Sequence, residues 1–252
     1  MEKILKELTG HSGSQIYLME DECGKYVKKI GGVQRNVERL KVLFQKGYCV
    51  PEIYLYYEDD DILKMQYIHG LDMKTYLLHN NTGLIINFIE SIIDSFSEDS
   101  VYKDYTEIYL KKLKWMENDT SLPFTRDELI SKLPKKLPSS VYHGDLTLEN
   151  IMHTDSGFYM IDPVTTEYNS YIFDIAKMRQ DLECKWFLRN TKTKLDTKLQ
   201  IIQDKLKRLY PEAFDDSLLI LMLLRVHQHT KVGDTNYNFI MKEINRLWKN
   251  IN

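Results

Sequence analysis

Most of the information in this chain lies in His143-Gly144-Asp145-Leu146-Thr147-Leu148-Glu149-Asn150, followed by Ile161-Asp162-Pro163. A carboxylate such as Asp145 can accept the proton of a hydroxyl group. The amide oxygen of Asn150 and the carboxylate of Asp162 are hard oxygen ligands of the kind that Mg²⁺ prefers. These are the groups that phosphoryl transfer requires. The two motifs therefore predict a catalytic carboxylate beside a metal–nucleotide site.

The residues between the two motifs predict how they meet. Ile151–His153 and Phe158–Ile161 have the composition of short strands, and Thr154-Asp155-Ser156-Gly157 between them is a hairpin turn signal. An antiparallel hairpin brings its two open ends together. We therefore expect Asn150 and Asp162 to be neighbours.

These motifs resemble the catalytic loop and metal-binding segment of small-molecule kinases of the aminoglycoside phosphotransferase/choline kinase type, which are related in fold to protein kinases. The interval from Asp145 to Asn150 matches the H-R-D-L-x-x-x-N loop of protein kinases. Gly144 stands in place of their Arg, and Thr147 stands where many of them carry Lys; both departures favour a small-molecule acceptor. Together with Phe173–Lys177, the motifs are also similar to a bacterial branch associated with capsule and surface polysaccharides. That similarity implies a sugar or polysaccharide precursor as the acceptor.

The resemblance implies the fold and the cofactors. We expect an α+β, bilobal protein-kinase-like fold with a small antiparallel-sheet N-lobe and a larger helical C-lobe. The N-lobe would comprise residues 1–70, a nucleotide-binding sheet plus one helix. The C-lobe would comprise residues 71–252 and carry the catalytic and metal-binding loops. The expected cofactors are ATP (or GTP) and Mg²⁺.

One lysine of the N-lobe is predicted to hold phosphate. Residues 25–30 read as a strand, and side chains alternate across a strand, so Val27 and Lys29 share one face while Lys28 points the other way. An apolar residue two positions before a lysine matches the V-A-I-K pattern, in which the lysine holds the α- and β-phosphates. We therefore choose Lys29. The alternatives are Lys28 or two solvated lysines.

The next segment, residues 33–46, predicts a helix, because four apolar residues recur at helical spacing: Val33, Val37, Leu40 and Phe44. Its only acidic residue is Glu38. The resemblance implies an ion pair between Glu38 and Lys29 that would fix the direction of the lysine. Glu38 lies beside the apolar stripe rather than within it, so a solvated surface glutamate is the alternative.

Two further segments are expected to contact the nucleotide. A turn of small residues between predicted strands at 4–8 and 16–19 would let backbone N–H groups approach phosphate oxygens. Its expected cofactor-binding residues are Gly10, Ser12, Gly13 and Ser14. The turn is not a full G-x-G-x-x-G, and a plain hairpin is the alternative.

The second of these segments is the end of the strand predicted at 62–68, which follows one at 53–57 and the acidic run Glu58–Asp61. In the family that the chain resembles, this position is the hinge between the lobes. The backbones of Gln66 and Ile68 would contact the adenine edge. Backbone recognition does not separate adenine from guanine. The acidic run itself reads as a solvated hairpin turn.

Composition limits the classes of function. A chain of 252 residues suffices for one bilobal domain or two small ones, and a net charge of −3 gives no basic surface for nucleic acid. Three scattered cysteines indicate a reducing compartment. The N-terminus lacks a signal-peptide core, and the longest apolar run, Leu218–Leu224, is too short for a bilayer. We expect a cytoplasmic protein whose partner is a small-molecule hydroxyl acceptor, with no nucleic acid and no membrane insertion; the oligomeric state stays open.

Two other classes compete with a kinase. The first is a catalytically inactive nucleotide-binding (pseudokinase) module, although such modules usually lack one of the three residues Asp145, Asn150 and Asp162. The second is a metallophosphoesterase, which needs His-rich ligand motifs such as Asp-x-His and Gly-Asn-His that the sequence does not contain. The acceptor pocket is less defined. Its candidates follow the metal segment, with core packing or surface placement as the alternative for each: Tyr168, Trp186 and Arg189.

Overall fold

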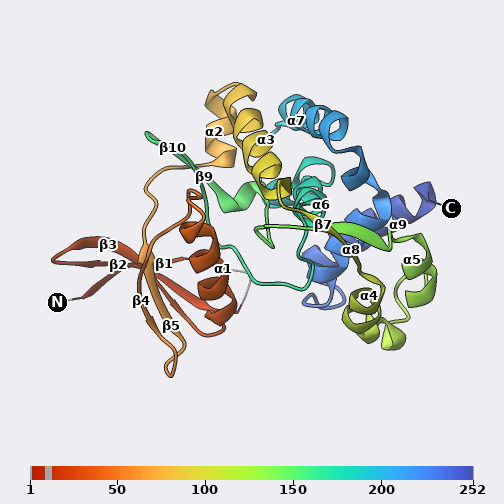
Figure 1. Ribbon diagram of the computed structural model, residues 1–252, viewed down its shortest axis with the longest axis horizontal. Coiled ribbons are helices and arrows are strands. Elements are labelled where there is room, and N and C mark those ends of the chain that lie inside the picture. The colour runs from red at the N-terminus through yellow and green to blue at the C-terminus, as the bar shows by residue number, and fades with distance from the viewer. Residues whose placement is uncertain (1, 9–12, 252) are drawn as a thin grey trace. The chain divides into compact units, whose positions relative to one another are not determined.

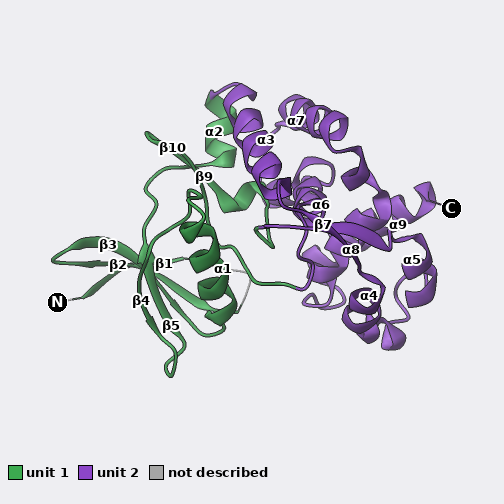
Figure 2. Ribbon diagram, in the orientation of Figure 1, with its two compact units in different colours: residues 1–79, 143–166 green, residues 80–142, 167–252 purple. Residues whose placement is uncertain are grey.

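The computed structural model describes residues 2–8 and 13–251 (Figure 1). The chain forms two compact units, Met1–His79 with His143–Thr166, and Asn80–Tyr142 with Glu167–Asn252 (Figure 2). By their contacts, the predicted catalytic and metal-binding segments therefore belong with the N-terminal sheet. These units group residues by their contacts and do not locate the boundary between lobes. The lobe boundary proposed at residue 70 therefore stays a prediction.

The first unit is built on a five-stranded antiparallel sheet in the order β1-β2-β3-β5-β4. Its strands are β1 (Lys3–Leu8), β2 (Gln15–Asp21), β3 (Gly24–Ile30), β4 (Ile53–Tyr57) and β5 (Ile62–Gln66). The strand β3 lies in the middle, where Lys29 is opposite Ile16 of β2 and Leu63 of β5. The predicted strands are confirmed, except that the last one ends at Gln66 rather than at residue 68.

Helix α1 (Gln34–Gln45) packs against β4. Three of the four predicted apolar positions are buried: Val33, Val37 and Leu40. The fourth buried apolar position is Leu43, with no exposed surface, whereas Phe44 is 51% exposed, so the prediction of Phe44 is wrong. With 3.6 residues per turn, the next residue on a face lies three or four positions on. Here the step of three stays on the buried side.

The start of α1 is held by the turn that joins β4 to β5. The Asp61 carboxylate accepts hydrogen bonds from the N–H groups of Gly32 and Val33, the latter at 3.0 Å, and its carbonyl accepts the N–H of Gly31 at 2.9 Å. Both N–H groups lie just before the first residue of α1, where an anion complements the positive end of the helix dipole. The acidic run forms the predicted turn, and one of its side chains has a structural task.

A second sheet of the same unit carries the segment 143–166. Its strands, in the order β10-β9-β6, are β6 (Leu71–Asp72), β9 (Ile151–Thr154) and β10 (Gly157–Met160). The predicted hairpin is confirmed, with Thr154 opposite Gly157. Helix α2 (Met73–His79) follows β6, and its Tyr76 ring packs edge-on against Phe158 of β10, with 5.2 Å between the ring centroids. This packing anchors the hairpin from one side.

The second unit is mainly helical. It contains α3 (Gly83–Ser97), β7 (Val101–Asp104), α4 (Thr106–Lys112), the 3₁₀ helix η1 (Lys114–Asn118), α5 (Arg126–Lys132), β8 (Lys136–Ser139), α6 (Tyr171–Leu182), η3 (Trp186–Leu188), α7 (Asp196–Leu209), η4 (Pro211–Phe214), α8 (Asp216–His227) and α9 (Thr235–Asn250). α6 is buried from its second residue to its last and packs against α8, which contains the buried apolar run at 218–224.

The predicted fold class is confirmed, because a small antiparallel sheet precedes a helical part. Two pairings were not predicted: β6 pairs with β9, and β7 and β8 form a two-stranded sheet. Among the described residues, no helix combines the length and the apolar character needed to cross a bilayer.

Candidate functional site

The loop at 143–150 is closed by the side chain of Asn150. Its amide Nδ2 donates to the Asp145 carbonyl oxygen at 2.8 Å and to the Asp145 carboxylate Oδ2 at 3.1 Å. The turn between them is the 3₁₀ helix η2 (Leu148–Asn150), in which the Asn150 N–H donates to the Thr147 carbonyl. Because the Nδ2 group faces Asp145, the amide oxygen of Asn150 lies on the other side of the amide group. Two of the three predicted residues are thus in direct contact.

Gly144 is required by a close approach of backbone. It has a φ of +91°, and a Cβ atom there would lie 2.0 Å from the Val164 carbonyl oxygen. The Val164 N–H donates to the His143 carbonyl at 3.0 Å, which holds the two segments at this distance. No side chain fits at residue 144 without separating them. This explains physically why glycine stands where protein kinases carry arginine.

The hairpin brings Ile161, the residue before Asp162, next to Asn150, so its two open ends meet as predicted. The N–H of Ile161 donates to the Asn150 carbonyl at 2.9 Å, just beyond the paired strands β9 and β10. Asp162 itself has a φ of +58°, a left-handed conformation that is uncommon for residues other than glycine. Such a conformation persists where surrounding contacts determine it, and it is frequent at functional sites.

Those contacts include Lys29. The Lys29 ammonium group forms an ion pair with Asp162 Oδ1, and the lysine side chain is 2% exposed against 37% for the aspartate. A buried ammonium group requires such a partner, because its hydration is lost. Lys28 lies on the opposite face of β3 and is only half-buried. The alternation of side chains along the strand is therefore as expected, with Val27 and Lys29 on the buried face.

The predicted pair between Lys29 and Glu38 does not form among the described residues. Glu38 is exposed and accepts a hydrogen bond from the Gln34 side chain at 3.2 Å. The reason is the phase of α1: its buried face runs through Val37 and Leu40, and Glu38 falls on the solvent side of it. The alternative of a solvated glutamate is what the structure contains.

Asn36 was missed by the sequence analysis. Its Nδ2 donates to Asp162 Oδ1 at 3.0 Å and to the Pro163 carbonyl at 2.8 Å, and the residue is 7% exposed. The neighbouring Arg35 bonds Thr165 twice: its Nε donates to the Thr165 carbonyl at 2.7 Å, and its carbonyl accepts the Thr165 N–H at 2.9 Å. The available signal was an asparagine next to the apolar stripe, directly before Val37.

His143 braces the loop. It has no exposed surface. Its Nε2 lies 3.1 Å from the Ile161 carbonyl, and its Nδ1 accepts the Asp145 N–H at 3.3 Å. A carbonyl only accepts, so the proton is on Nε2 and the ring is neutral. Burial lowers the pKa of His143 to about 4, although the charges of Asp145 and Asp162 act in the opposite direction. This geometry suits a residue that holds the loop in place rather than one that transfers a proton.

The expected phosphate-binding turn is described only in part. Gly10 and Ser12 lie outside the described residues. Gly13 has a φ of +79°, and nothing lies within 4 Å of the place where its Cβ would be. The Ser14 hydroxyl donates to the Gly31 carbonyl at 2.6 Å and so ties the start of β2 to the end of β3.

The expected hinge follows β5. The Gln66 N–H donates to the Glu52 carbonyl at 2.8 Å, so this donor is used within the unit, while the Gln66 side-chain oxygen accepts the Glu52 N–H at 3.3 Å. Ile68 lies beyond the strand and is 7% exposed. No backbone hydrogen bond within the described part of the chain involves Ile68. Of the two expected contacts, Gln66 therefore already uses its backbone N–H, whereas the backbone of Ile68 has no such bond to the described residues.

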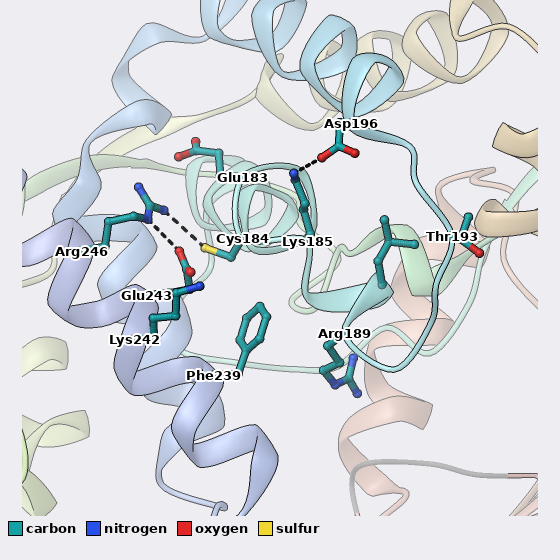
Figure 3. Close-up of a pocket in the computed structure, with 11 residues that line it drawn as sticks. Glu183, Cys184, Lys185, Arg189, Thr193, Asp196, Phe239, Lys242, Glu243 and Arg246 are labelled. Carbon is teal, nitrogen blue, oxygen red and sulfur yellow. Dashed lines mark hydrogen bonds and ion pairs between the residues drawn. The ribbon is translucent and has the colours of Figure 1, made fainter.

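The second unit contains a pocket of about 470 Å³ (Figure 3), lined by residues of the segments 183–196 and 239–246. Two ion pairs border it: Lys185 with Asp196, and Arg246 with Glu243, the second at 2.8 Å. In Figure 3 the Phe239 side chain lies below both pairs. A volume of this size is typical of small-molecule sites.

The three candidates for the acceptor pocket have different positions. Arg189 lines the pocket, with its guanidinium group 3.9 Å from the centre of the Trp186 ring. Trp186 is 6% exposed and packs against Phe239, with 5.5 Å between the ring centroids. Tyr168 is 4% exposed and packs against Phe173, so core packing is the correct interpretation for this residue.

The described residues contain no group of three or more His, Cys, Asp or Glu side chains arranged to hold a metal ion. The arrangement of Asp145, Asn150 and Asp162 differs from such a cluster because one of its three members is an amide. Two carboxylates and an amide supply oxygen donors only. This donor set excludes the sulfur and nitrogen ligation typical of zinc and agrees with a hard cation such as Mg²⁺.

Solved structures with the same fold are small-molecule phosphotransferases. A thermostable mutant of aminoglycoside phosphotransferase APH(4)-Ia, in ternary complex with AMP-PNP and hygromycin B, matches with a TM-score of 0.71 at 10% identity over 99% of this chain and 94% of that one. Choline kinase LicA from Streptococcus pneumoniae matches with a TM-score of 0.62 at 18% identity over 99% and 94%. LicA in complex with AMP matches with a TM-score of 0.55 at 20% identity over 98% and 93%.

At these identities the matches show the fold. The chain has the fold of aminoglycoside phosphotransferases and choline kinases, as the sequence motifs predicted. No protein-family model and no curated protein sequence matches the chain.

Proposed function

We propose that the chain is a Mg²⁺-dependent phosphotransferase that moves the γ-phosphoryl group of ATP, or of GTP, to a hydroxyl group of a small metabolite. The observation that carries this proposal is the convergence of Asp145, Asn150 and Asp162 within one compact unit. Lys29 joins them through its ion pair with Asp162. A proton acceptor, two oxygen ligands and a buried cation are the components of a phosphoryl-transfer site.

The donors fit Mg²⁺. Lys29 and Asn36 both donate hydrogen bonds to Oδ1 of the Asp162 carboxylate. Its Oδ2 accepts no hydrogen bond from the residues that the structure describes. The Asn150 amide oxygen is likewise turned away from Asp145. These two oxygens, Asp162 Oδ2 and the Asn150 amide oxygen, are the proposed metal ligands, and a bound Mg²⁺ neutralises charge on the nucleotide phosphates.

The proposed transfer is a single in-line displacement. The acceptor hydroxyl oxygen attacks the γ-phosphorus, the bond between that phosphorus and the bridging oxygen breaks, and the nucleoside diphosphate leaves. Asp145 orients the hydroxyl group and accepts its proton. A positioned base of this kind typically contributes about 10²–10⁴-fold to the rate. Lys29 provides a fixed positive charge for the phosphates.

The nucleotide is proposed to lie against the N-terminal sheet. Gly10, Ser12, Gly13 and Ser14 would approach its phosphates, while the backbones of Gln66 and Ile68 would approach the base. Solved structures of this fold have been determined with AMP-PNP, ADP and AMP, which supports a nucleotide ligand here. ATP and Mg²⁺ are abundant in the cytoplasm, where we place the protein.

The acceptor is proposed to be a sugar or polysaccharide precursor, as the sequence motifs imply.

The test of the function is a screen of metabolite hydroxyls for Mg-ATP-dependent phosphorylation, with Asp145→Asn as the variant. Asp155→Asn is the matched control, because Asp155 is an exposed aspartate of the β9–β10 turn. Transfer should fall by about 10²-fold or more in Asp145→Asn and persist in Asp155→Asn. Near wild-type transfer in Asp145→Asn would show that the assigned base is wrong.

One observation favours a second candidate, a nucleotide-binding module without catalysis. The expected ion pair between Lys29 of β3 and Glu38 of α1 does not form among the described residues, and Glu38 is exposed. Tight binding of Mg-ATP without transfer to any acceptor and without ATP hydrolysis would favour this candidate.

A further inference from the structure

Two consecutive residues of helix α1 form hydrogen bonds with the proposed metal-binding segment, residues 162–165. Arg35 exchanges two hydrogen bonds with Thr165, at 2.7 and 2.9 Å. Asn36 donates to Asp162 Oδ1 at 3.0 Å and to the Pro163 carbonyl at 2.8 Å. The four bonds span residues 162–165, and all of them lie within the first compact unit.

Asn36 is matched to this position. It is 7% exposed, so its amide protons need acceptors within the protein. An amide NH₂ group has two protons, and the structure supplies one side-chain and one main-chain acceptor for them. Both protons of the Asn36 amide group therefore have acceptors in the metal-binding segment.

The position of Asn36 determines which oxygen of Asp162 stays accessible. Lys29 and Asn36 both donate to Oδ1. Asp162 has a φ of +58°, so its backbone is held in a conformation that carries an intrinsic cost. The bond from Asn36 to Pro163 holds the backbone, and the bond to Oδ1 holds the carboxylate. Together they direct Oδ2 away from α1.

We propose that Asn36 is a positioning residue that orients Asp162 toward the Mg²⁺–nucleotide complex, an inference that rests on the proposed function. A neutral amide suits the task better than a carboxylate. A carboxylate at residue 36 would have no proton to donate to Asp162, would repel it, and would compete for the Lys29 ammonium group. The helix therefore acts on the aspartate rather than on the lysine.

The test compares Asn36→Ala and the isosteric Asn36→Asp with wild type. Gln34→Ala is the matched control, because it removes an exposed side-chain amide from the same helix. The first measurement is hydrogen–deuterium exchange of residues 161–166 in the nucleotide-free protein. The second is binding of a fluorescent ATP analogue as Mg²⁺ is titrated, and the third is the thermal melting temperature, which reports whether each variant is folded.

Both Asn36 variants should exchange faster at 161–166 than wild type. They should also raise the Mg²⁺ concentration for half-maximal nucleotide binding about tenfold or more, the range typical for loss of a partner that orients a metal ligand. Asn36→Asp should have the larger effect, because it adds repulsion. Gln34→Ala should match wild type in both measurements.

Unchanged Mg²⁺ dependence in folded Asn36→Ala and Asn36→Asp would overturn the inference, and so would nucleotide binding in the wild type that is independent of Mg²⁺. The function can fail separately. Wild type could bind nucleotide in a Mg²⁺-dependent way that the Asn36 variants impair, yet transfer phosphate to no acceptor. That result would support the positioning role and contradict the transferase function.

Discussion

Lys29 and Asp162, 133 residues apart in the chain, form an ion pair in which the lysine side chain is almost fully buried. The pair connects the middle strand of the N-terminal sheet to the segment after the β9–β10 hairpin. It therefore places the proposed phosphate-binding cation beside a proposed metal ligand. The first prediction follows from this contact.

Lys29→Met should lower kcat/KM for the nucleotide by about 10²–10³-fold, the effect typical of removing one fixed electrostatic group from a transition state. Lys28→Met is the control, since Lys28 lies on the other face of β3. Steady-state kinetics with varied ATP measures both. Similar losses in the two variants would mean that the lysines have been assigned wrongly.

Gly144→Ala should destabilise the protein severely, because its Cβ would lie 2.0 Å from the Val164 carbonyl oxygen. Gly157→Ala is the control: it also has a positive φ, but nothing lies within 4 Å of its Cβ position. Both changes incur backbone strain of about 1 kcal/mol or more. Urea unfolding should show a clearly larger loss for Gly144→Ala; equal losses would remove the steric explanation.

Asp61→Ala should lower the free energy of unfolding by about 1–3 kcal/mol, because it removes the charged acceptor of the Gly32 and Val33 N–H groups. Asp60→Ala tests the same acidic turn at an exposed position and should have no measurable effect. Urea unfolding of the two variants distinguishes a structural aspartate from a solvated one. An unchanged free energy of unfolding in Asp61→Ala would show that α1 does not depend on this turn.

His143 should make stability depend on pH. Its pKa falls from 6.5 to about 4 on folding because it is buried. Between these values the unfolded chain binds the proton and the folded chain does not, so stability rises with pH by up to about 1.4 kcal/mol per unit. This contribution is complete above pH 6.5 and is lost as the pH falls toward 4.

The corresponding measurement is urea unfolding at pH 5.0 and 6.5. The difference in unfolding free energy between the two pH values should be smaller in His143→Gln than in wild type by about 2 kcal/mol. His69→Gln, at an exposed histidine, should keep the wild-type difference. If His143→Gln also keeps it, the ring is not held neutral by burial.

Local sequence signals were sufficient where a single element determines the geometry. The turn at 154–157 specified the hairpin, and the hairpin alone brings Asn150 next to the residue before Asp162. Alternation along β3 specified that Lys29, rather than Lys28, faces the interior. Both inferences depend on the period of a strand, which the sequence displays directly.

The sequence did not specify contacts between elements distant in the chain. The bond from Asn36 to Asp162 joins residues 126 apart, and the bonds from Asp61 reach back to the start of α1. Glu38 was chosen because it was the acidic residue of its helix, yet the helix presents Asn36 to the site instead. The strands β7 and β8 were not predicted. β8 contains Pro138, and proline within a segment argues against a strand.

The most direct test of the account is a crystal structure of the protein with a non-hydrolysable ATP analogue and Mg²⁺. The account predicts a metal ion within about 2.1 Å of the Asn150 amide oxygen and of an Asp162 carboxylate oxygen, bridging the nucleotide phosphates. It also predicts the Lys29 ammonium group beside those phosphates. A nucleotide bound elsewhere, or a metal ion held without Asn150 and Asp162, would contradict it.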